Sequence, residues 1–190
     1  EGVTAINKKT NTTTTYTSDP TDVNSLLSRE SGALKVLKSG EVWVASVYGG
    51  VSVIGADRKT ITRYTDEGAE GDIIGGKINT IFQSSDRRVY LSSSKGTSIF
   101  EGKAFKNSLY NQTIKNSQVS DVNVFFEDKQ GGFWVGTNTN GLFKINKDDL
   151  SVLEQYKLDP NNPKSFASST VYEILETKEG TLLFGTGGEG

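Results

Sequence analysis

The sequence predicts an all-β protein, a β-propeller built of four-stranded antiparallel blades. The first observation is a motif that occurs four times in the sequence. The segment GGFWVGTNTNGLFKIN at 131–146 has counterparts at 40–55 and 87–102 and a shortened copy at 180–190. The second observation is the regular distance between the copies, and the third is a composition rich in turn residues. Together they indicate repeated strand-and-turn units of the kind that form propeller blades.

The distance between the copies can be counted on aromatic residues. Tyr16, Tyr64, Tyr110 and Tyr156 each end one copy, at spacings of 48, 46 and 46 residues. Repeats of about 40 to 50 residues that hold several strands are typical of propellers. The spacing therefore predicts one blade per copy.

The composition agrees with turn-rich β-structure. The chain has 190 residues, which is enough for one domain with a real core, and it contains 21 Gly but only 3 Pro. With 21 basic and 23 acidic residues the net charge is −2, and the basic residues do not cluster, so a nucleic-acid partner is not expected. There is no run of 18 apolar residues, and we expect no direct membrane contact of this segment.

The strands of one unit follow from the residue pattern between 117 and 156. The run 122–127 is β-branched and aromatic and predicts the innermost strand, which a polar, glycine-bearing turn joins to a second strand at 133–137. A third strand is expected at 142–146 and an outer one at 152–156. The unit is thus a four-stranded meander.

The same pattern places strands in the other units. Further innermost strands are expected at 33–37, 78–83 and 171–176, and further outer strands at 13–16, 60–64 and 104–110. We therefore treat residues 1–190 as one propeller domain. Its blade repeats are about 22–64, 72–110, 117–156, and 169–190 completed by 1–16.

The split repeat leaves two ways to complete the fourth blade. The two ends of one chain can pair and make a four-bladed ring, or the ends of different chains can pair and make a larger ring, with eight blades for two molecules. An unpaired strand edge invites pairing with another chain, and four blades strain a ring. We therefore expect self-association, with a homodimer as the simplest case.

The repeat resembles the two-component regulator propeller family. The residues that carry the resemblance are the strand and turn at 131–142, the closing Tyr156, the segment DPNNPKS at 159–165, and a second copy of that segment at 18–26. The copy at 87–102 departs most, because Tyr90 replaces Trp. The resemblance implies the periplasmic sensor region of an inner-membrane hybrid two-component system, as found in gut bacteria, and a role in carbohydrate sensing. A histidine kinase would belong to the parent protein.

The absence of two residue types limits the chemistry of the chain. With no His and no Cys, the sequence offers no imidazole base, thiolate nucleophile or ordinary zinc site, and we expect no metal, no cofactor and no catalytic residue. Carboxylates remain, and a glycosidase needs two that face each other. They stand between strands and are interpreted as solvated turn residues, namely Glu127, Asp128, Asp148, Asp149, Glu176 and Glu179.

Ligand-binding residues are expected on loops at one face of the propeller. One family of loops joins second and third strands, and the other joins one blade to the next. The candidates belong to the first family and are Tyr48, Lys95, Asn138, Asn140 and Glu189. The two asparagines have an alternative interpretation as turn residues with positive φ. The strand aromatics Trp43, Tyr90 and Trp134 are interpreted as core residues rather than sugar platforms.

Two functional hypotheses from different classes follow. The first is a non-enzymatic sensor segment that responds to an oligosaccharide through these loops. The second is a propeller-fold lyase or glycan-cleaving enzyme that uses carboxylate, Tyr or Arg chemistry, and two facing carboxylates in a central pocket would favour it. A protein-interaction scaffold without a small ligand is a third reading, because a fold alone does not define a function.

Overall fold

The computed structural model describes residues 2–67, 71–93, 95–109, 119 and 121–188. These residues form sixteen strands and no helix, so the predicted all-β class is confirmed. Three of the five sheets have four strands, and two have two strands.

The three four-stranded sheets each follow chain order. The first contains β3 (Ser31–Val36), β4 (Val42–Ser46), β5 (Val51–Ile54) and β6 (Ile61–Tyr64). The second contains β7 (Ile78–Gln83), β8 (Val89–Ser93), β9 (Gly96–Phe100) and β10 (Phe105–Leu109). The third contains β11 (Val122–Glu127), β12 (Phe133–Thr137), β13 (Leu142–Ile145) and β14 (Val152–Tyr156). All neighbours are antiparallel, as in the predicted meander.

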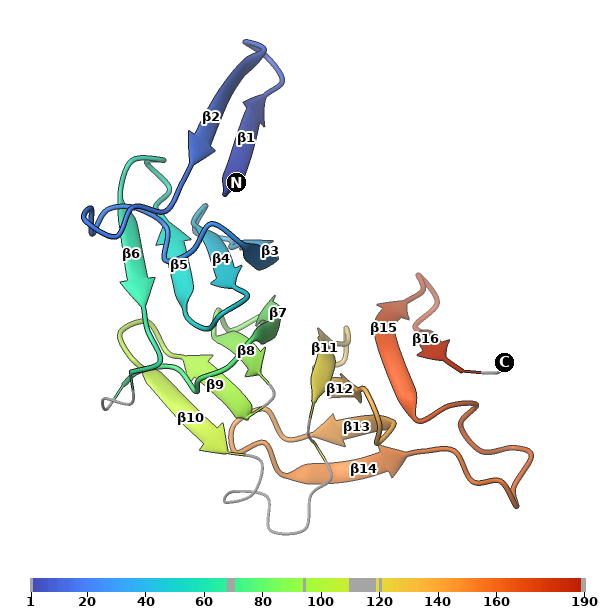
Figure 1. Ribbon diagram of the computed structural model, residues 1–190. Helices are drawn as coiled ribbons and strands as arrows, with labels where there is room; N and C mark the ends of the chain where they lie inside the picture. Colours follow the sequence, from blue (N-terminus) through green and yellow to red (C-terminus); the bar gives the residue numbers. More distant parts are fainter. Residues whose placement is uncertain (1, 68–70, 94, 110–118, 120, 189–190) are drawn as a thin grey trace.

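The two remaining sheets are halves of a blade. The first consists of β1 (Val3–Asn7) and β2 (Thr12–Tyr16), and the second of β15 (Thr170–Glu176) and β16 (Leu182–Gly187). Figure 1 shows them at opposite ends of an open arc, where they form separate sheets. The structure therefore contains three whole blades and an unjoined half-blade at each end.

Most strand limits agree with the sequence pattern to within one residue. The strand β3 differs most, since it was expected at 33–37 and spans Ser31–Val36. Two of the smaller differences have local causes. The third strand of the last whole blade ends at Ile145 because Asn146 already closes a turn, with its Oδ1 accepting the N–H of Asp148 at 2.9 Å. β6 begins at Ile61 because the N–H of Thr60 bonds to Asp57 Oδ1 at 3.1 Å. The closing residue Tyr110 lies outside the described residues.

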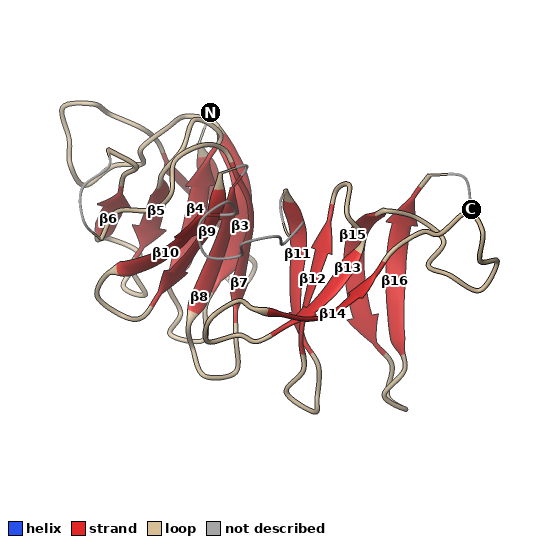
Figure 2. Cartoon of the chain, turned by 90° about the horizontal axis from the view of Figure 1, so that it is seen from below, coloured by secondary structure: helices blue, strands red, loops and turns tan. Residues whose placement is uncertain are grey.

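The sheets stand side by side along the arc like blades around an axis (Figures 1 and 2). β3 packs against β7, β7 against β11, and β11 against β15, so the first strands line the concave side. β6, β10 and β14 lie on the outer side. This arrangement confirms the propeller-type fold, in the form of a segment whose ring is not closed.

Hydrophobic clusters fill the spaces between successive sheets. Trp43, Tyr90 and Trp134 lie in three of these clusters, with exposed fractions of 1%, 0% and 8%. Tyr90 contacts the ring of Phe133 in the next sheet, with 4.8 Å between centroids. The interpretation of these aromatics as core residues is thus confirmed.

A hydrogen bond recurs at each junction between two inner strands, and we name it the junction latch. The last residue of the inner strand accepts a backbone N–H from the first turn of the preceding sheet. Lys38 N donates to Gln83 Oε1 at 2.8 Å, and Ser85 N donates to Glu127 Oε2 at 2.5 Å. At the third junction Lys129 N donates to Glu176 Oε2 at 2.9 Å.

The latch corrects one expectation about the carboxylates. Glu127 and Glu176 are not solvated turn residues, because their side chains are only 9% and 4% exposed. They end strands and are buried against the neighbouring sheet. Asp128 does act as a turn residue, since its Oδ1 accepts the N–H of Gly132 at 2.6 Å, and its other oxygen accepts Trp134 Nε1–H at 2.7 Å.

Candidate ligand-binding site

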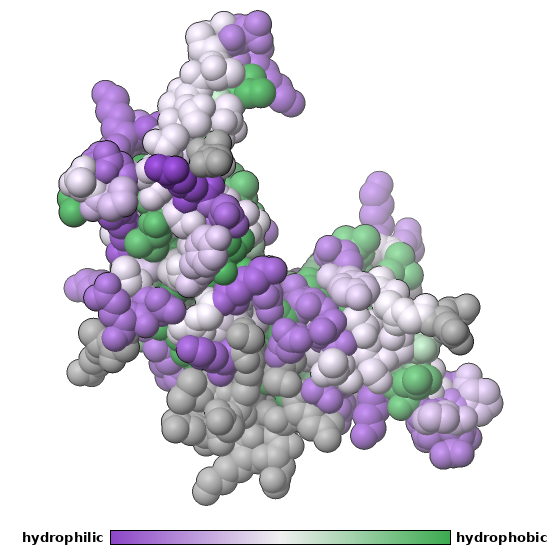
Figure 3. Space-filling view, in the orientation of Figure 1, coloured by the Kyte–Doolittle hydropathy of each residue, from purple (hydrophilic) through white to green (hydrophobic). Residues whose placement is uncertain are grey.

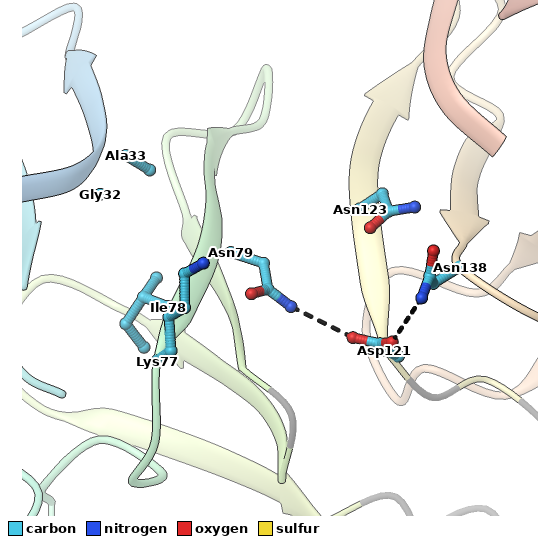
Figure 4. Close-up of a pocket in the computed structure, with 8 residues that line it drawn as sticks. All are labelled: Gly32, Ala33, Lys77, Ile78, Asn79, Asp121, Asn123 and Asn138. Atoms are coloured by element: carbon cyan, nitrogen blue, oxygen red, sulfur yellow. Dashed lines mark hydrogen bonds between the residues drawn. The ribbon is translucent and has the colours of Figure 1, made fainter. Parts of the chain in front are cut away.

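A polar cavity of about 430 Å³ lies on the concave side of the arc, where the inner strands of three sheets approach one another. Figure 4 shows its lining, which comes from β3, β7, β11 and the loops beside them. The lining residues are Gly32, Ala33, Lys77, Ile78, Asn79, Asp121, Asn123 and Asn138.

The two asparagines on strands reach the cavity because each one sits at a β-bulge. In β7 the pairing moves from Ile78 to Thr80 while the partner strand advances by one residue, so Asn79 is the extra residue. In β11 the same shift lies between Val122 and Val124 and leaves Asn123 as the extra residue. A bulge bends the strand and re-aims a side chain, and bulges are common beside functional sites.

Bulges occupy the same place in the other two inner strands. In β15 the extra residue is Tyr172, which is 58% exposed. In β3 the register shift covers Gly32 and Ala33. The wall formed by β3 thus carries no polar side chain, whereas β7 and β11 each contribute a carboxamide.

Asp121 links the polar groups of the cavity. Its Oδ1 accepts a hydrogen bond from Asn79 Nδ2 at 3.4 Å, and its Oδ2 accepts one from Asn138 Nδ2 at 3.1 Å (Figure 4). Its φ is 52°, in the left-handed region where Asp and Asn are the best tolerated side chains after Gly. Non-glycine residues in this region cluster at functional sites, where the surrounding structure holds them in place.

Two of the asparagines are also fixed by the following sheet. Asn123 Nδ2 donates to the carbonyl of Val171 at 3.1 Å, and Thr170 Oγ1 donates to the carbonyl of Asn138 at 2.7 Å. β15 therefore holds the far wall of the cavity in position. Each carboxamide that donates through its nitrogen still carries an oxygen that can accept a hydrogen bond.

The charges of the lining suit a neutral polar ligand. Lys77 and Asp121 are the charged residues of the lining, and they have opposite signs. Three carboxamides supply both donors and acceptors, which match hydroxyl groups. Asp121 is the single carboxylate among the described lining residues, so this cavity lacks the facing carboxylate pair of a glycosidase.

Four of the five predicted site residues are described by the structure, and one of these, Asn138, lines this cavity. Asn140 lies on the same turn but serves the turn, because its N–H donates to Thr137 Oγ1 at 3.0 Å and its carbonyl accepts Gln155 Nε2–H at 3.1 Å. Gly141, with a φ of 83°, takes the left-handed conformation of this turn. Neither asparagine has a positive φ, so that part of their alternative interpretation as turn residues is wrong.

Tyr48 and Lys95 lie away from the cavity lining. Tyr48 is 74% exposed and donates its hydroxyl to Glu30 Oε1 at 3.1 Å, and this hydrogen bond raises the pKa of Tyr48 above its usual value. Lys95 is exposed in the turn between β8 and β9, where its N–H bonds to Ser93 Oγ at 3.2 Å. Glu189 lies outside the described residues.

Asn79, Asp121 and Asn123 were missed in the sequence analysis. The sequence does contain a signal for two of these residues. Asn79 and Asn123 each follow the first apolar residue of an inner strand, 44 residues apart, which is also the distance from Tyr90 to Trp134. A polar residue repeated inside an apolar strand pattern indicates a bulge or a binding position.

Comparison with family models identifies the repeat that holds most of these residues. Residues 116–139 match the model of the "Two component regulator propeller" family. This match contains Asp121, Asn123 and Asn138. The fold and this match define the class of the protein as a propeller segment. The chain carries a two-component regulator propeller repeat, so the resemblance predicted from the sequence is confirmed. No curated protein sequence matches the chain.

Solved structures support the fold. The extracellular domain of a putative hybrid two-component system from B. thetaiotaomicron is 18% identical, with a TM-score of 0.66, over 97% of this chain and 29% of that one. PorZ, a surface component of the type-IX secretion system of Porphyromonas gingivalis, is 19% identical, with a TM-score of 0.65, over 95% of this chain and 27% of that one. A putative gluconolactonase is 12% identical, with a TM-score of 0.53, over 90% and 59%.

At these identities the likeness is one of fold. This chain spans less than a third of the length of the first two structures. Within the described residues, no helix has the length and apolar character needed to cross a membrane.

Proposed function

We propose that the chain is a ligand-binding segment of a periplasmic sensor of the two-component type, and that the cavity between β7 and β11 takes a neutral, hydroxyl-rich ligand such as an oligosaccharide. The observation that carries the proposal is the set of Asn79, Asp121, Asn123 and Asn138, which two bulges and one left-handed residue aim into a single cavity. The family match over residues 116–139 supports the sensory class and the periplasmic location.

The chemistry of the set favours hydroxyl groups over ions. A carboxylate accepts hydrogen bonds from hydroxyls, and carboxamides can donate and accept at once. Lys77 and Asp121 balance each other, so a charged ligand gains little net attraction. The ring of Tyr172 is 58% exposed at the equivalent bulge of the next inner strand, β15, where it offers an apolar face.

Calorimetry with neutral and acidic oligosaccharides tests the proposal. We expect a neutral oligosaccharide to bind, and we expect Asn79→Ala and Asp121→Asn to weaken that binding by about tenfold each, since a hydrogen bond contributes about 1 kcal/mol or somewhat more. Asn161→Ala, in the exposed loop before β15, is the matched control and should not change the affinity. Binding that is equal in all three variants would place the ligand elsewhere on the chain.

The proposed role is not enzymatic. A single carboxylate in the lining does not supply the acid and the base of the usual glycosidase mechanism. Incubation of the chain with the same oligosaccharides should therefore give no cleavage or elimination products. A turnover that Asp121→Asn abolishes would support the enzyme hypothesis instead.

A further inference from the structure

The turn between the first and second strands of a sheet has the same backbone hydrogen bond in all four copies. One residue donates its N–H to the carbonyl three residues earlier, and these donors are Gly40, Arg87, Gly131 and Gly180. The three glycines have φ values of 89°, 84° and 85°, and Arg87 has a φ of 72°. Arg87 therefore stands where the other copies place glycine in the left-handed conformation.

The left-handed conformation is unfavourable for an arginine. It brings Cβ close to the following carbonyl oxygen, and glycine avoids this contact because it has no Cβ. The turn itself does not require an arginine, since the three glycine copies form the same hydrogen bond. Non-glycine residues that are held in this region cluster at functional sites, so the conformation of Arg87 points to a role for its side chain.

The side chain of Arg87 has no polar partner in the part of the chain that the structure describes. It is exposed and takes part in no hydrogen bond or ion pair with these residues. Its neighbour Arg88 is the opposite case, because its guanidinium lies 2.7 Å from Asp86 Oδ2 and 2.6 Å from Asp148 Oδ1. An unpaired guanidinium thus stands beside a neutralised one.

Arg87 lines a pocket of about 240 Å³ at the β7–β8 and β9–β10 turns. The other lining residues are Asp86, Arg88, Phe100, Glu101 and Gly102. The sheet β7–β10 lies between two four-stranded sheets, away from the hydrophobic surface over β15 and β16 and on the β1–β2 hairpin (Figures 1 and 3). The pocket is also at the opposite end of β7 from the cavity that Asn79 lines.

The lining offers two unpaired charges of opposite sign. Asp86 is neutralised by Arg88 and by Lys147, whose Nζ lies 3.2 Å from Asp86 Oδ2. Glu101 resembles Arg87, because it is exposed and its side chain bonds to no other described residue. One guanidinium and one carboxylate therefore remain for a ligand.

A free α-amino acid matches these two groups. Its carboxylate fits the forked N–H donors of a guanidinium, and its ammonium group donates to a carboxylate. A purely anionic ligand would instead meet the like charges of Asp86 and Glu101. The volume is below the about 300–1,000 Å³ of drug-sized pockets, and the half-buried Phe100 adds apolar surface for an amino-acid side chain.

We infer that this pocket binds a free α-amino acid, with the ligand carboxylate on Arg87 and the ligand ammonium group on Glu101. The site differs in place and in chemistry from the oligosaccharide cavity and does not depend on it. The unfavourable conformation of Arg87 is retained because it holds a guanidinium at the pocket, which a glycine cannot supply.

Nuclear magnetic resonance titrations of the isotope-labelled chain test the class of ligand. We expect L-phenylalanine, among the three probes glycine, L-leucine and L-phenylalanine, to shift the backbone amide signals of Arg87 and Gly102. Phenylalanine amide lacks the carboxylate and N-acetylphenylalanine lacks the ammonium group, so each should bind at least about tenfold more weakly. Absence of binding by all three amino acids overturns the inference, and so does equal binding of either derivative.

Two substitutions test the residues. Arg87→Gly restores the residue of the other three turns, so the unfolding temperature should not fall, while binding of L-phenylalanine weakens at least about tenfold. Glu101→Gln should weaken it about fivefold. The matched control Lys38→Ala removes an exposed cation from the equivalent turn of the first four-stranded sheet and should not change the affinity.

Three results would count against the site. An unchanged affinity of Arg87→Gly overturns the role of the guanidinium. A loss of affinity in Lys38→Ala equal to that in Arg87→Gly would show general charge attraction in place of a defined pocket. A lower unfolding temperature of Arg87→Gly contradicts the backbone strain on which the inference rests.

Discussion

One position of the repeat is buried in one sheet and exposed in another. It is buried at the junction between the second and third four-stranded sheets, and it is exposed on the outward face of β3. Phe125 pairs with Val135 and is 4% exposed in the junction. Leu34 pairs with Val44 at the equivalent position of its own sheet and is 55% exposed. Glu127, the last residue of its strand, accepts the hydrogen bond of the junction latch, whereas the last residue of β3 is Val36. The difference shows that burial in this fold is a property of neighbouring repeats and not of the strand.

The pairing of an inner strand within its own sheet does not depend on a preceding sheet that covers it. β3 keeps its pairing with β4 from Ser31 to Val36 although its outward face is uncovered. Pairing within a sheet is thus local, and packing between sheets adds a separate contribution to stability. This division is typical of repeat proteins, whose stability is a sum of repeat and interface contributions.

The largest effect is expected from truncating the buried position. Phe125→Ala should lower the free energy of unfolding by about 3–5 kcal/mol, because it leaves a cavity among Phe82, Tyr90 and Phe133. Leu34→Ala at the equivalent position should cost less than about 1 kcal/mol, because this side chain is 55% exposed. Urea denaturation measures both, and equal losses would contradict the comparison.

The second largest loss of stability is expected from removing a junction latch. Glu127→Ala removes the acceptor of the Ser85 N–H and a partner of Lys147, and we expect a loss of about 1–3 kcal/mol. Glu127→Gln should cost less, since Gln83 already performs the same role one junction earlier. Thermal unfolding of the two variants separates the latch from the charge. A glutamine variant as unstable as the alanine variant would indicate that the ion pair dominates.

Acid should weaken the same junction. Burial raises the pKa of Glu127, but the hydrogen bonds from Ser85 and Lys147 outweigh it and hold the pKa below the ordinary 4.5. The hydrogen bond from Arg88 likewise lowers the pKa of Asp86 below 3.8. Their stabilisation is therefore present above these ordinary values and is lost as the pH falls through them toward the lower folded-state values. Urea midpoints between about pH 7 and pH 3 should fall less in Glu127→Gln than in the wild type.

The smallest effect is expected at the cavity. Asp121→Ala removes the acceptor for Asn79 and Asn138 and places a β-carbon without a polar group at a φ of 52°, which should cost about 1–2 kcal/mol. Asp121→Asn should cost less, because Asn tolerates this conformation and keeps one acceptor. Denaturation curves that do not distinguish the two variants would show that Asp121 is not held by these contacts.

The fold could be predicted from the sequence because its signals are local. Alternation within strands and glycine at the turns place β7, β11, β12 and β14 at their predicted limits. Tyr16, Tyr64 and Tyr156 end β2, β6 and β14 as their spacing predicts. The strand and turn signals are contained within one repeat, and the tyrosine spacing shows that the repeat recurs along the chain.

The candidate site could be predicted only in part. Asn138 was found because it follows a strand on a loop, where binding residues are expected. Asn79 and Asn123 depend on bulges, which shift the register by one residue and are invisible to a count of alternating residues. Asp121 depends on a backbone conformation and on a partner 42 residues away, and neither can be read from its own segment.

The junction latch places very unequal demands on its two partners. The acceptors are Gln83, Glu127 and Glu176, which all need a side-chain oxygen of the same reach. The donors are Lys38, Ser85 and Lys129, and each uses only its main-chain nitrogen, which every amino acid except proline provides. The donor turns are consequently free to diverge by mutation without loss of fit, and a duplicated repeat could join an existing array as soon as its inner strand ends in Glu or Gln.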